Sequence, residues 1–435
     1  MTGFFSERFF IMSKNWKSAT LAVQAGYTPA DGESRVTPIV QSTTFRYDNT
    51  QSVADLFDLK RAGFFYSRLA NPTVEVMEKK IAALEGGVAA VALSSGQTAN
   101  TLAIMNIAQA GDHVVASAAL YGGTVNLFTV TLPKMGIKVT LVDADASEAE
   151  IAAAVRPNTR AIFAETIANP ALTVLDFEKF SSVARRFDLP LIVDNTFPTP
   201  MLCKPFEFGA NIVTHSTTKY LDGHAVSLGG VVVEGGNYNW ANGKYPELST
   251  PDPSYHGLVY TDAFPESPYS VKMRVQLVRD LGCIQAPMNA WLTNMGMETL
   301  ALRMERHSTN ALAMAEYLKN HPKVEWVSYP MLPGDSQYER AVKYLRGGSG
   351  VLSFGVKGGK EAAAKLLDSL KLAALVVHVA DLRTCVLHPA SMTHRQLTDE
   401  QLAAAGVKPE LVRLSVGIED IEDIKADFEQ ALNKL

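Results

Sequence analysis

The stretch NIVTHSTTKYLDGHAVSLGGVVVE, residues 211–234, joins two apolar runs through a polar turn. The runs at 211–215 and 228–234 have the Val and Ile content of buried strands, whereas the turn opens with three hydroxyl side chains in a row and also carries Lys219 and a histidine. Polar groups at the end of a buried strand cost free energy unless they are hydrogen-bonded or bind a ligand. The turn is therefore a candidate functional site.

Five more apolar runs of the same kind precede this stretch, at 88–93, 113–117, 138–144, 160–166 and 189–195. Their apolar residues are continuous rather than alternating, which is typical of strands covered on both faces in a parallel sheet. Segments with a helical period lie between them, for example 97–108 and 176–187. The sequence thus predicts an α/β domain with a mostly parallel sheet of seven strands.

The remainder of the chain predicts a second, smaller unit. Residues 235–268 are rich in Gly, Pro and aromatic residues without periodicity, which predicts a long loop of the kind that is usually functional or mobile. Residues 270–318 look helical, and 347–435 mix strands with helices. We expect a large domain at 71–289, a smaller C-terminal α+β domain at 290–435 and a loose leader at 1–14.

Composition excludes several classes of partner. The 435 residues include 40 basic and 45 acidic side chains, a formal net charge of -5, which leaves no electrostatic footprint for nucleic acid or an anionic membrane. No apolar run reaches the roughly 18 to 20 residues that span a bilayer. The three cysteines show no CxxC spacing, which fits a reducing cytoplasm. Small molecules and copies of the same chain are the expected partners.

Residues that follow the predicted strands matter most, because ligands in open α/β sheets bind beyond the carboxyl ends of the strands. After 88–93, the sequence SSGQ at 94–97 opens a helix, whose free N–H groups and dipole attract an anion. Asp194 lies at the end of the run 189–195. Ser216 and Thr218 can face one way and bind a phosphate, with Lys219 beside it.

Each signal alone has a structural alternative, since Ser95 could simply cap a helix and Asp194 could simply close a turn. Together, a phosphate site, a carboxylate and a lysine match what pyridoxal phosphate needs. The carboxylate keeps the pyridine nitrogen protonated, and a buried lysine of lowered pKa binds the aldehyde. The GxGxxG string of nicotinamide sites and the GxxxxGK[ST] string of nucleotide sites are both absent.

Several separated motifs in this order resemble the Cys/Met-metabolism family of fold-type I pyridoxal-phosphate enzymes, from about residue 20 to 435. The resemblance implies the fold of that family and pyridoxal 5'-phosphate as cofactor. The matching motifs are Tyr66-Ser67-Arg68 with Asn71-Pro72-Thr73, Ser94-Ser95-Gly96, Leu120-Tyr121-Gly122-Gly123, Glu165 with Asn169-Pro170, Val193-Asp194-Asn195, Ser216 to Lys219, His388-Pro389-Ala390 and Arg413-Leu414-Ser415-Val416-Gly417.

The resemblance implies a role for each matching residue at the cofactor. Lys219 would bind the aldehyde and shuttle protons, Asp194 would pair with the pyridine nitrogen, and Tyr121 would stack on the ring. The groups that would bind the phosphate are the N–H groups of Gly96 and Gln97 and the hydroxyls of Ser216 and Thr218.

Substrate and subunit contacts are implied in the same way. Arg413 would take the substrate α-carboxylate as a bidentate fork, and Asn169 would lie near the ring oxygen and that carboxylate. Tyr66 and Arg68, in an N-terminal arm at 1–70, would reach the phosphate of a neighbouring subunit. The active site would then need at least a dimer, and a dimer of dimers is expected. Tyr121 and Tyr66 are also candidate acid/base groups.

Within the family, three features resemble the O-acetylhomoserine sulfhydrylase branch: the length of the chain, the aromatic loop 235–268 and the tail from 391 to 413. They imply γ-replacement on O-acetyl-L-homoserine by sulfide or a small thiol, giving homocysteine or methionine plus acetate. A methionine or cystathionine γ-lyase remains the alternative, although Gly123 stands where methionine γ-lyases generally carry a cysteine.

One stretch departs from the branch pattern. Val377-His378-Val379-Ala380-Asp381 stands where sulfhydrylases commonly show Asn-Val-Gly-Asp and lyases Ser-Leu-Gly, so His378 is a candidate substrate contact of open role. The histidines 215, 224, 388 and 394 lack helical i, i+4 spacing and accompanying thiolates, so no metal site is predicted. His215, Asp222 and His224 have no role assigned from the sequence.

Overall fold

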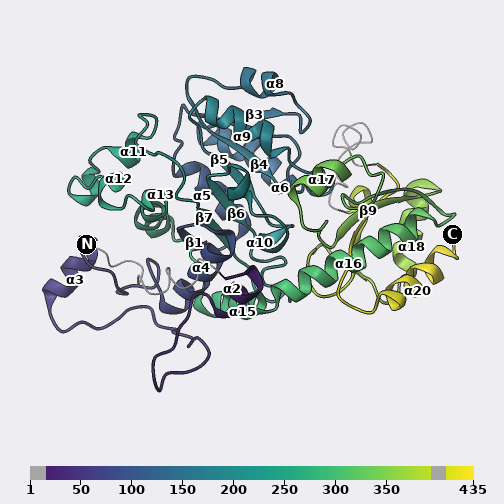
Figure 1. The fold of residues 1–435 in the computed structure, drawn as a ribbon, viewed down its shortest axis with the longest axis horizontal. Helices are drawn as coiled ribbons and strands as arrows, with labels where there is room; N and C mark the ends of the chain where they lie inside the picture. The colour runs from purple at the N-terminus through teal and green to yellow at the C-terminus, as the bar shows by residue number, and fades with distance from the viewer. Residues whose placement is uncertain (1–15, 393–407) are drawn as a thin grey trace.

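The computed structural model describes residues 16–392 and 408–435. Its centre is a sheet of seven strands in the order β1-β7-β6-β5-β4-β2-β3, here called the large sheet (Figure 1). The strands are β1 (Ala89–Leu93), β2 (His113–Ser117), β3 (Lys138–Val142), β4 (Thr159–Glu165), β5 (Leu191–Asp194), β6 (Ile212–His215) and β7 (Gly230–Glu234). All seven predicted strands are confirmed.

The large sheet is parallel except at β7, which pairs antiparallel with both β1 and β6. Strands β3, β2, β4, β5 and β6 run the same way, so their carboxyl ends meet at one edge of the sheet. The polar turn 216–229 connects β6 to the antiparallel β7. It therefore begins at the edge where the other strands end.

Helices cover both faces of the large sheet, as the continuous apolar strands predict. On one face the core includes Met77 of α4 (Pro72–Glu85) and Phe180 of α9 (Phe177–Arg186). On the other face it includes Leu102 of α5 (Gly96–Met105) and Met273, which follows α13 (Pro268–Lys272). Shorter helices of this unit are α2 (Ser18–Gln24), α6 (Gly122–Asn126), α7 (Leu132–Lys134), α8 (Glu148–Ala153) and α10 (Thr199–Leu202).

The segment 235–268 is not an open loop, although its composition predicts one. It contains α11 (Pro246–Ser249) and α12 (Tyr260–Ala263), and Trp240, Tyr245 and Tyr260 are buried in the core beside α5. The Trp240 ring stacks on Tyr269 with centroids 4.9 Å apart. Its aromatic residues thus pack inward, which period-based prediction cannot detect in an irregular segment.

A second sheet, here called the small sheet, lies at the C-terminal end of the chain, with strand order β10-β11-β12-β9-β8. Its strands are β8 (Val324–Ser328), β9 (Val351–Val356), β10 (Ala374–Leu375), β11 (Cys385–Leu387) and β12 (Leu411–Ser415). Helices α15 (Pro287–Glu298) and α16 (Leu300–Lys319) lead from the large sheet to the small one, as Figure 1 shows for α16. Helices α18 (Gly359–Ser369) and α20 (Ile421–Leu432) pack on the small sheet.

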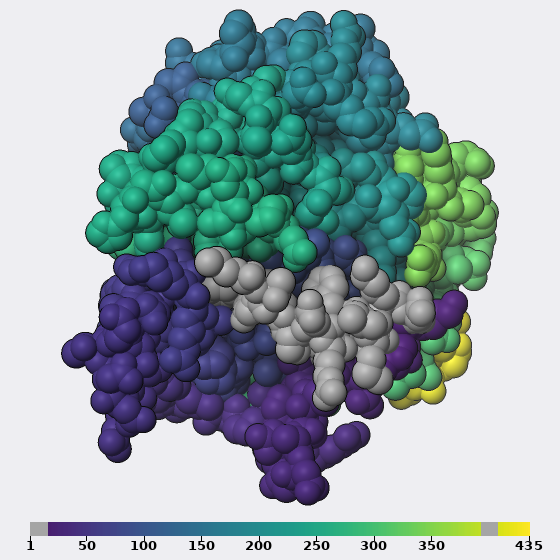
Figure 2. Space-filling view, turned by 60° about the vertical axis from the view of Figure 1, so that its left-hand side comes forward, coloured from purple at the N-terminus to yellow at the C-terminus, as the bar shows by residue number. Residues whose placement is uncertain are grey.

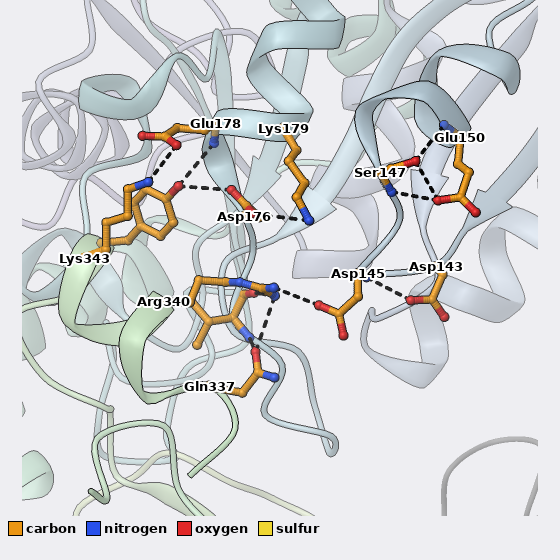
Figure 3. A network of polar contacts seen from close by, with 12 residues as sticks. Asp143, Asp145, Ser147, Glu150, Asp176, Glu178, Lys179, Gln337, Arg340 and Lys343 are labelled. Atoms are coloured by element: carbon orange, nitrogen blue, oxygen red, sulfur yellow. Dashed lines mark hydrogen bonds and ion pairs between the residues drawn. The ribbon is translucent and has the colours of Figure 1, made fainter. Parts of the chain in front are cut away.

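A contact through α17 (Tyr338–Tyr344) fixes the small unit against the large one (Figure 3). Arg340 pairs with Asp145 at 2.8 Å, and Lys343 pairs with Glu178 at 2.6 Å. These pairs are largely exposed and contribute little alone. Apolar packing under them does more, because the Tyr344 ring lies 5.2 Å from Phe177.

Part of the N-terminal segment extends away from this core, although Leu21, Ala22 and Ala25 pack into it. Helix α3 (Thr50–Phe57) projects from the body of the molecule in Figure 1, and the segment forms the lower part of the face in Figure 2, in purple. Whether residues 1–70 act as an arm towards a neighbour stays a prediction, as do the domain boundaries at 71 and 290; the expected leader 1–14 lies outside the described residues. No helix in 16–392 or 408–435 combines the length and apolarity needed to cross a membrane.

Gly230, the first residue of β7, is expected to be essential for the packing of the sheet edge. A Cβ atom there would lie 2.1 Å from the backbone oxygen of Ser95, which cannot move without displacing α5. Gly230→Ala should lower the free energy of unfolding by about 1–3 kcal/mol, the usual range for overpacking. Urea denaturation measures this, with Gly122→Ala as control because its Cβ would meet nothing within 4 Å. Equal stability of the two variants would contradict the prediction.

Candidate active site

Three polar residues form a row across neighbouring strands at the carboxyl edge of the large sheet. Glu165 of β4 is in register with Asp194 of β5, which is in register with Thr214 of β6. All three are buried. Asn100 of α5 bridges two of them, donating to Asp194 Oδ2 at 3.1 Å and accepting from Thr214 Oγ1 at 2.6 Å.

Asp194 is a buried carboxyl group that is held by hydrogen bonds but has no basic side chain paired with it among the described residues. Thr196 donates to its Oδ1 from the backbone N–H at 3.1 Å and from the hydroxyl at 2.5 Å. Within 16–392 and 408–435, no basic side chain forms an ion pair with it. A buried carboxylate normally requires a cationic partner, so this position fits a protonated ring nitrogen of a ligand.

The N-terminus of α5 approaches the turn after β6 closely enough to form a binding site for a phosphate. Ser95 caps the helix by accepting from the N–H of Thr98 at 3.1 Å. The N–H groups of Gly96 and Gln97, in the first helical turn, have no intrahelical acceptor. A Cβ on Gly96 would lie 2.6 Å from Cβ of Ser216, so only glycine allows this approach.

The structure brings Ser216 to this helix end but engages Thr218 elsewhere. The Thr218 hydroxyl donates to Gly229 O and accepts from Gly229 N–H, both at 3.1 Å. Its one proton is therefore used within the turn, and donation to a phosphate would require that bond to break. The clearest donors in this geometry are the first N–H groups of α5 and the Ser216 side chain.

Lys219 lies in the same turn with its amine directed towards the small sheet. Burial, and next to it the positive charge of Arg413, lower the pKa of Lys219 to about 8. Its Nζ lies 3.3 Å from Nδ1 of His378. A larger fraction of this lysine is thus a free amine near neutral pH than for an exposed lysine, as a nucleophilic lysine needs.

Arg413 of β12 brings a buried guanidinium to the site from the small sheet. It donates to Asn169 Oδ1 at 3.4 Å and to the backbone oxygen of His378 at 3.1 Å. No carboxylate pairs with it within the described part of the chain, and burial lowers its pKa. Its fork of donors is therefore available to a small carboxylate ligand.

Tyr121 precedes α6 with its ring about half exposed, and its backbone N–H donates to Glu165 Oε2 at 2.6 Å. Burial, and then the charge of Asp194, raise the pKa of Glu165 well above its usual value. Glu165 thus favours its neutral form more than an exposed carboxyl does, and it holds the backbone of Tyr121. Gly123 leaves room for the ring, because a Cβ there would lie 2.6 Å from it.

The other residues singled out from the sequence lie away from these groups. Arg68 stacks over the Tyr66 ring at 4.9 Å from its centroid, and no contact links either residue to Lys219 or Asp194 within the described residues. His215 Nε2 contacts Glu85 Oε1 at 2.6 Å, in a wholly buried pair. Asp222 closes the end of the turn by accepting from the N–H of His224 at 3.1 Å.

Taken together, these groups fit pyridoxal phosphate, because a phosphate site, an unpaired carboxylate and a lysine of lowered pKa lie at one edge of the large sheet, where Ser216 N–H donates to the same Thr196 hydroxyl that holds Asp194. Within 16–392 and 408–435, no cluster of three or more His, Cys, Asp or Glu side chains could hold a metal ion. Comparison with known proteins decides the family. Residues 19–433 match the family described as Cys/Met metabolism PLP-dependent enzymes.

The chain belongs to this pyridoxal-phosphate-dependent family. It is 47% identical to an O-acetyl-L-homoserine sulfhydrylase of Leptospira meyeri, over 98% of each chain. It is 46% identical to a homocysteine synthase of Schizosaccharomyces pombe, over 95% of this chain and 97% of that one. A crystal structure of a putative O-acetylhomoserine (thiol)-lyase from Campylobacter jejuni, which contains N'-pyridoxyl-lysine-5'-monophosphate, superposes with a TM-score of 0.92 at 37% identity, covering 96% and 100% of the two chains.

Membership of the family confirms the predicted fold and cofactor. Sequence patterns assigned no role to three residues that orient site groups. Asn100 and Thr196 hold Asp194, and Glu165 holds the backbone of Tyr121. Asn100 lies one helical turn after Gly96, so its position on the same face of α5 was a usable signal. Thr196 gave no such signal, because its role depends on the turn after β5.

Glu165 offers a test of its neutral state. Glu165→Gln should retain activity within about threefold, because an amide oxygen can accept from Tyr121 N–H as the neutral acid does. Glu165→Leu leaves that N–H without an acceptor, and a loss of about 1–3 kcal/mol corresponds to a drop in kcat/KM of about 5- to 160-fold. Steady-state kinetics at pH 7.5 measure both. Equal losses in the two variants would contradict a neutral Glu165.

Proposed function

We propose that this enzyme catalyses γ-replacement on O-acetyl-L-homoserine, with sulfide or a small thiol as the incoming group and acetate as the leaving group. The products are homocysteine or methionine. The observation that supports this most is the near full-length identity of 47% to a sulfhydrylase, on a chain whose Lys219, Asp194 and Arg413 stand in one site.

The site residues divide the work between the two sheets. Arg413, with Asn169, would bind the α-carboxylate of the amino acid and so orient the substrate for loss of its α-proton. Pyridoxal phosphate, bound with its ring nitrogen at Asp194, supplies an electron sink for the pair left when the α-proton departs. Lys219 removes that proton and returns it, as a general base whose pKa lies near the working pH.

The other predicted site residues take part in the same scheme. Tyr121, which precedes α6, would stack on the ring and, with Tyr66 of a neighbouring subunit, assist proton transfer. Gly96, Gln97 and Ser216 bind the phosphate, and Thr218 joins them if its bond to Gly229 opens. A γ-lyase activity on methionine or cystathionine is the alternative, because it needs the same cofactor residues. Gly123, in place of a cysteine, argues against the methionine lyase.

We also propose that the active site is shared between subunits, in a dimer or a dimer of dimers. In support, Tyr66 and Arg68 make no contact with Lys219 or Asp194 of their own chain within the described residues, and a cavity of about 1470 Å³ is lined by residues of 16–40 and of α4. The three cysteines are free thiols, which fits the proposed cytoplasmic location. The tail features from 393 to 407 that resemble the sulfhydrylase branch lie outside the described residues.

Lys219→Ala tests the central role. Homocysteine formation from O-acetyl-L-homoserine and sulfide should fall by at least about a thousandfold, because both the covalent link and the base are lost. Circular dichroism should show an unchanged fold. For the wild-type enzyme, homocysteine is quantified against 2-oxobutyrate released from methionine. Dominant 2-oxobutyrate without homocysteine would establish the lyase alternative instead.

Arg413→Lys tests carboxylate binding. Replacing a bidentate fork by a single ammonium should raise KM for the amino acid about tenfold or more, with a smaller change in kcat, since a charge-assisted hydrogen bond is worth about 1.5–3 kcal/mol. Arg346→Lys is the matched control, because Arg346 is exposed at the surface. An unaltered KM in Arg413→Lys would remove Arg413 from the substrate site.

A further inference from the structure

His378 makes a contact that the proposed reaction has not used. Its Nδ1 lies 3.3 Å from Nζ of Lys219, and its backbone oxygen accepts from Arg413 at 3.1 Å. The residue is therefore held in the site by its main chain and directs its ring at the reactive lysine. The sequence suggested a substrate contact, whereas the ring in this structure contacts Lys219.

The surroundings of the other ring nitrogen, Nε2, indicate which tautomer His378 adopts. Nε2 is buried and has no hydrogen-bond partner among the described residues, and the nearest carboxylate oxygen, Asp381 Oδ2, lies 3.9 Å away. A carboxylate at this distance favours the tautomer with its proton on Nε2. That tautomer leaves the Nδ1 lone pair for Lys219, whose ammonium has three donors and no acceptor.

We propose that His378 is the positioning residue for Lys219: in its neutral form it accepts a hydrogen bond from the lysine ammonium through Nδ1, and on protonation it releases and repels the lysine. This deepens the proposed function, because it assigns to His378 the handling of the base on which that reaction depends. The contact exists between two side chains of this chain and can be measured without turnover.

The charged surroundings of His378 set the pH at which the contact breaks. Burial, and then the charge of Lys219, lower the pKa of His378 below its usual 6.5. The titratable or charged groups around the ring and its main chain are Lys219, Arg413, Cys385, Asp381 and Asp222. The two acids oppose the lowering. The ring is consequently more often neutral near neutral pH than an exposed histidine, and protonating it takes a lower pH.

The first test measures the pKa of Lys219 in the full-length, cofactor-free protein. Trace acetylation by acetic anhydride across pH, quantified by mass spectrometry, reports each lysine separately. His378→Leu removes the acceptor without admitting a polar group, so the pKa of Lys219 should fall by about one unit, given the strength of a bond to a charged donor. His378→Asn retains an oxygen acceptor and should show less than half that fall.

Lys80 is the internal control for labelling, because its partner Glu298 lies outside the site and its pKa should be the same in all three proteins. An unchanged Lys219 pKa in His378→Leu would overturn the proposal. That result would not bear on the proposed sulfhydrylase reaction, because the labelling experiment contains no substrate. Absence of homocysteine in the product assay would overturn the proposed function while leaving the labelling result valid.

The second test uses the pH profile. In the wild-type enzyme kcat/KM should fall below about pH 8 as Lys219 is protonated, and protonation of His378 should add a second fall at lower pH, because the ring loses its acceptor and repels Lys219. His378→Asn cannot titrate, so this second fall should disappear and leave the limb of Lys219 alone. The same second fall in both proteins would overturn the role of His378 in turnover, since a merely structural residue would not move it.

Discussion

The site depends on the register of three parallel strands. Because β4, β5 and β6 end at the same edge, Glu165, Asp194 and Thr214 stand side by side without any long-range loop to bring them there. A shift of one residue in β5 would turn Asp194 to the opposite face and away from Asn100. The apolar residues that fill both faces of the sheet therefore also fix the carboxylate.

The second constraint is the close approach of α5 to the turns around it. Gly96 meets Ser216, and Gly230 meets the backbone of Ser95, at separations that no Cβ atom permits. These contacts place the positive end of the helix beside the turn that carries Lys219. The same close packing therefore positions both the anion site and the lysine. The glycines matter here for lack of volume, since neither has a positive φ.

Sequence patterns sufficed for the parts whose signal is local. The strand runs, Asp194 at a strand end and Lys219 in a polar turn are readable because each depends on its immediate neighbours. Three features depend on distant contacts: the inward packing of Trp240 and Tyr245, the engagement of Thr218 by Gly229, and the approach of His378 to Lys219. In the small sheet, β8 and β10 were not predicted; β10 has only two residues, too few for a period.

Charge is separated across the site by its construction from two sheets. The large sheet contributes carboxyl groups, of which Glu165 has a raised pKa and Asp194 is available to a cation, whereas the small sheet contributes Arg413. Lys219 follows β6 and directs its amine to His378, and the same arginine that can bind a substrate carboxylate also lowers the pKa of the lysine. A bound carboxylate would cancel part of that effect and make Lys219 more basic once substrate is in place. Substrate binding and base strength are thus coupled through one guanidinium, and the packing of α17 that fixes the sheets relative to each other maintains the coupling.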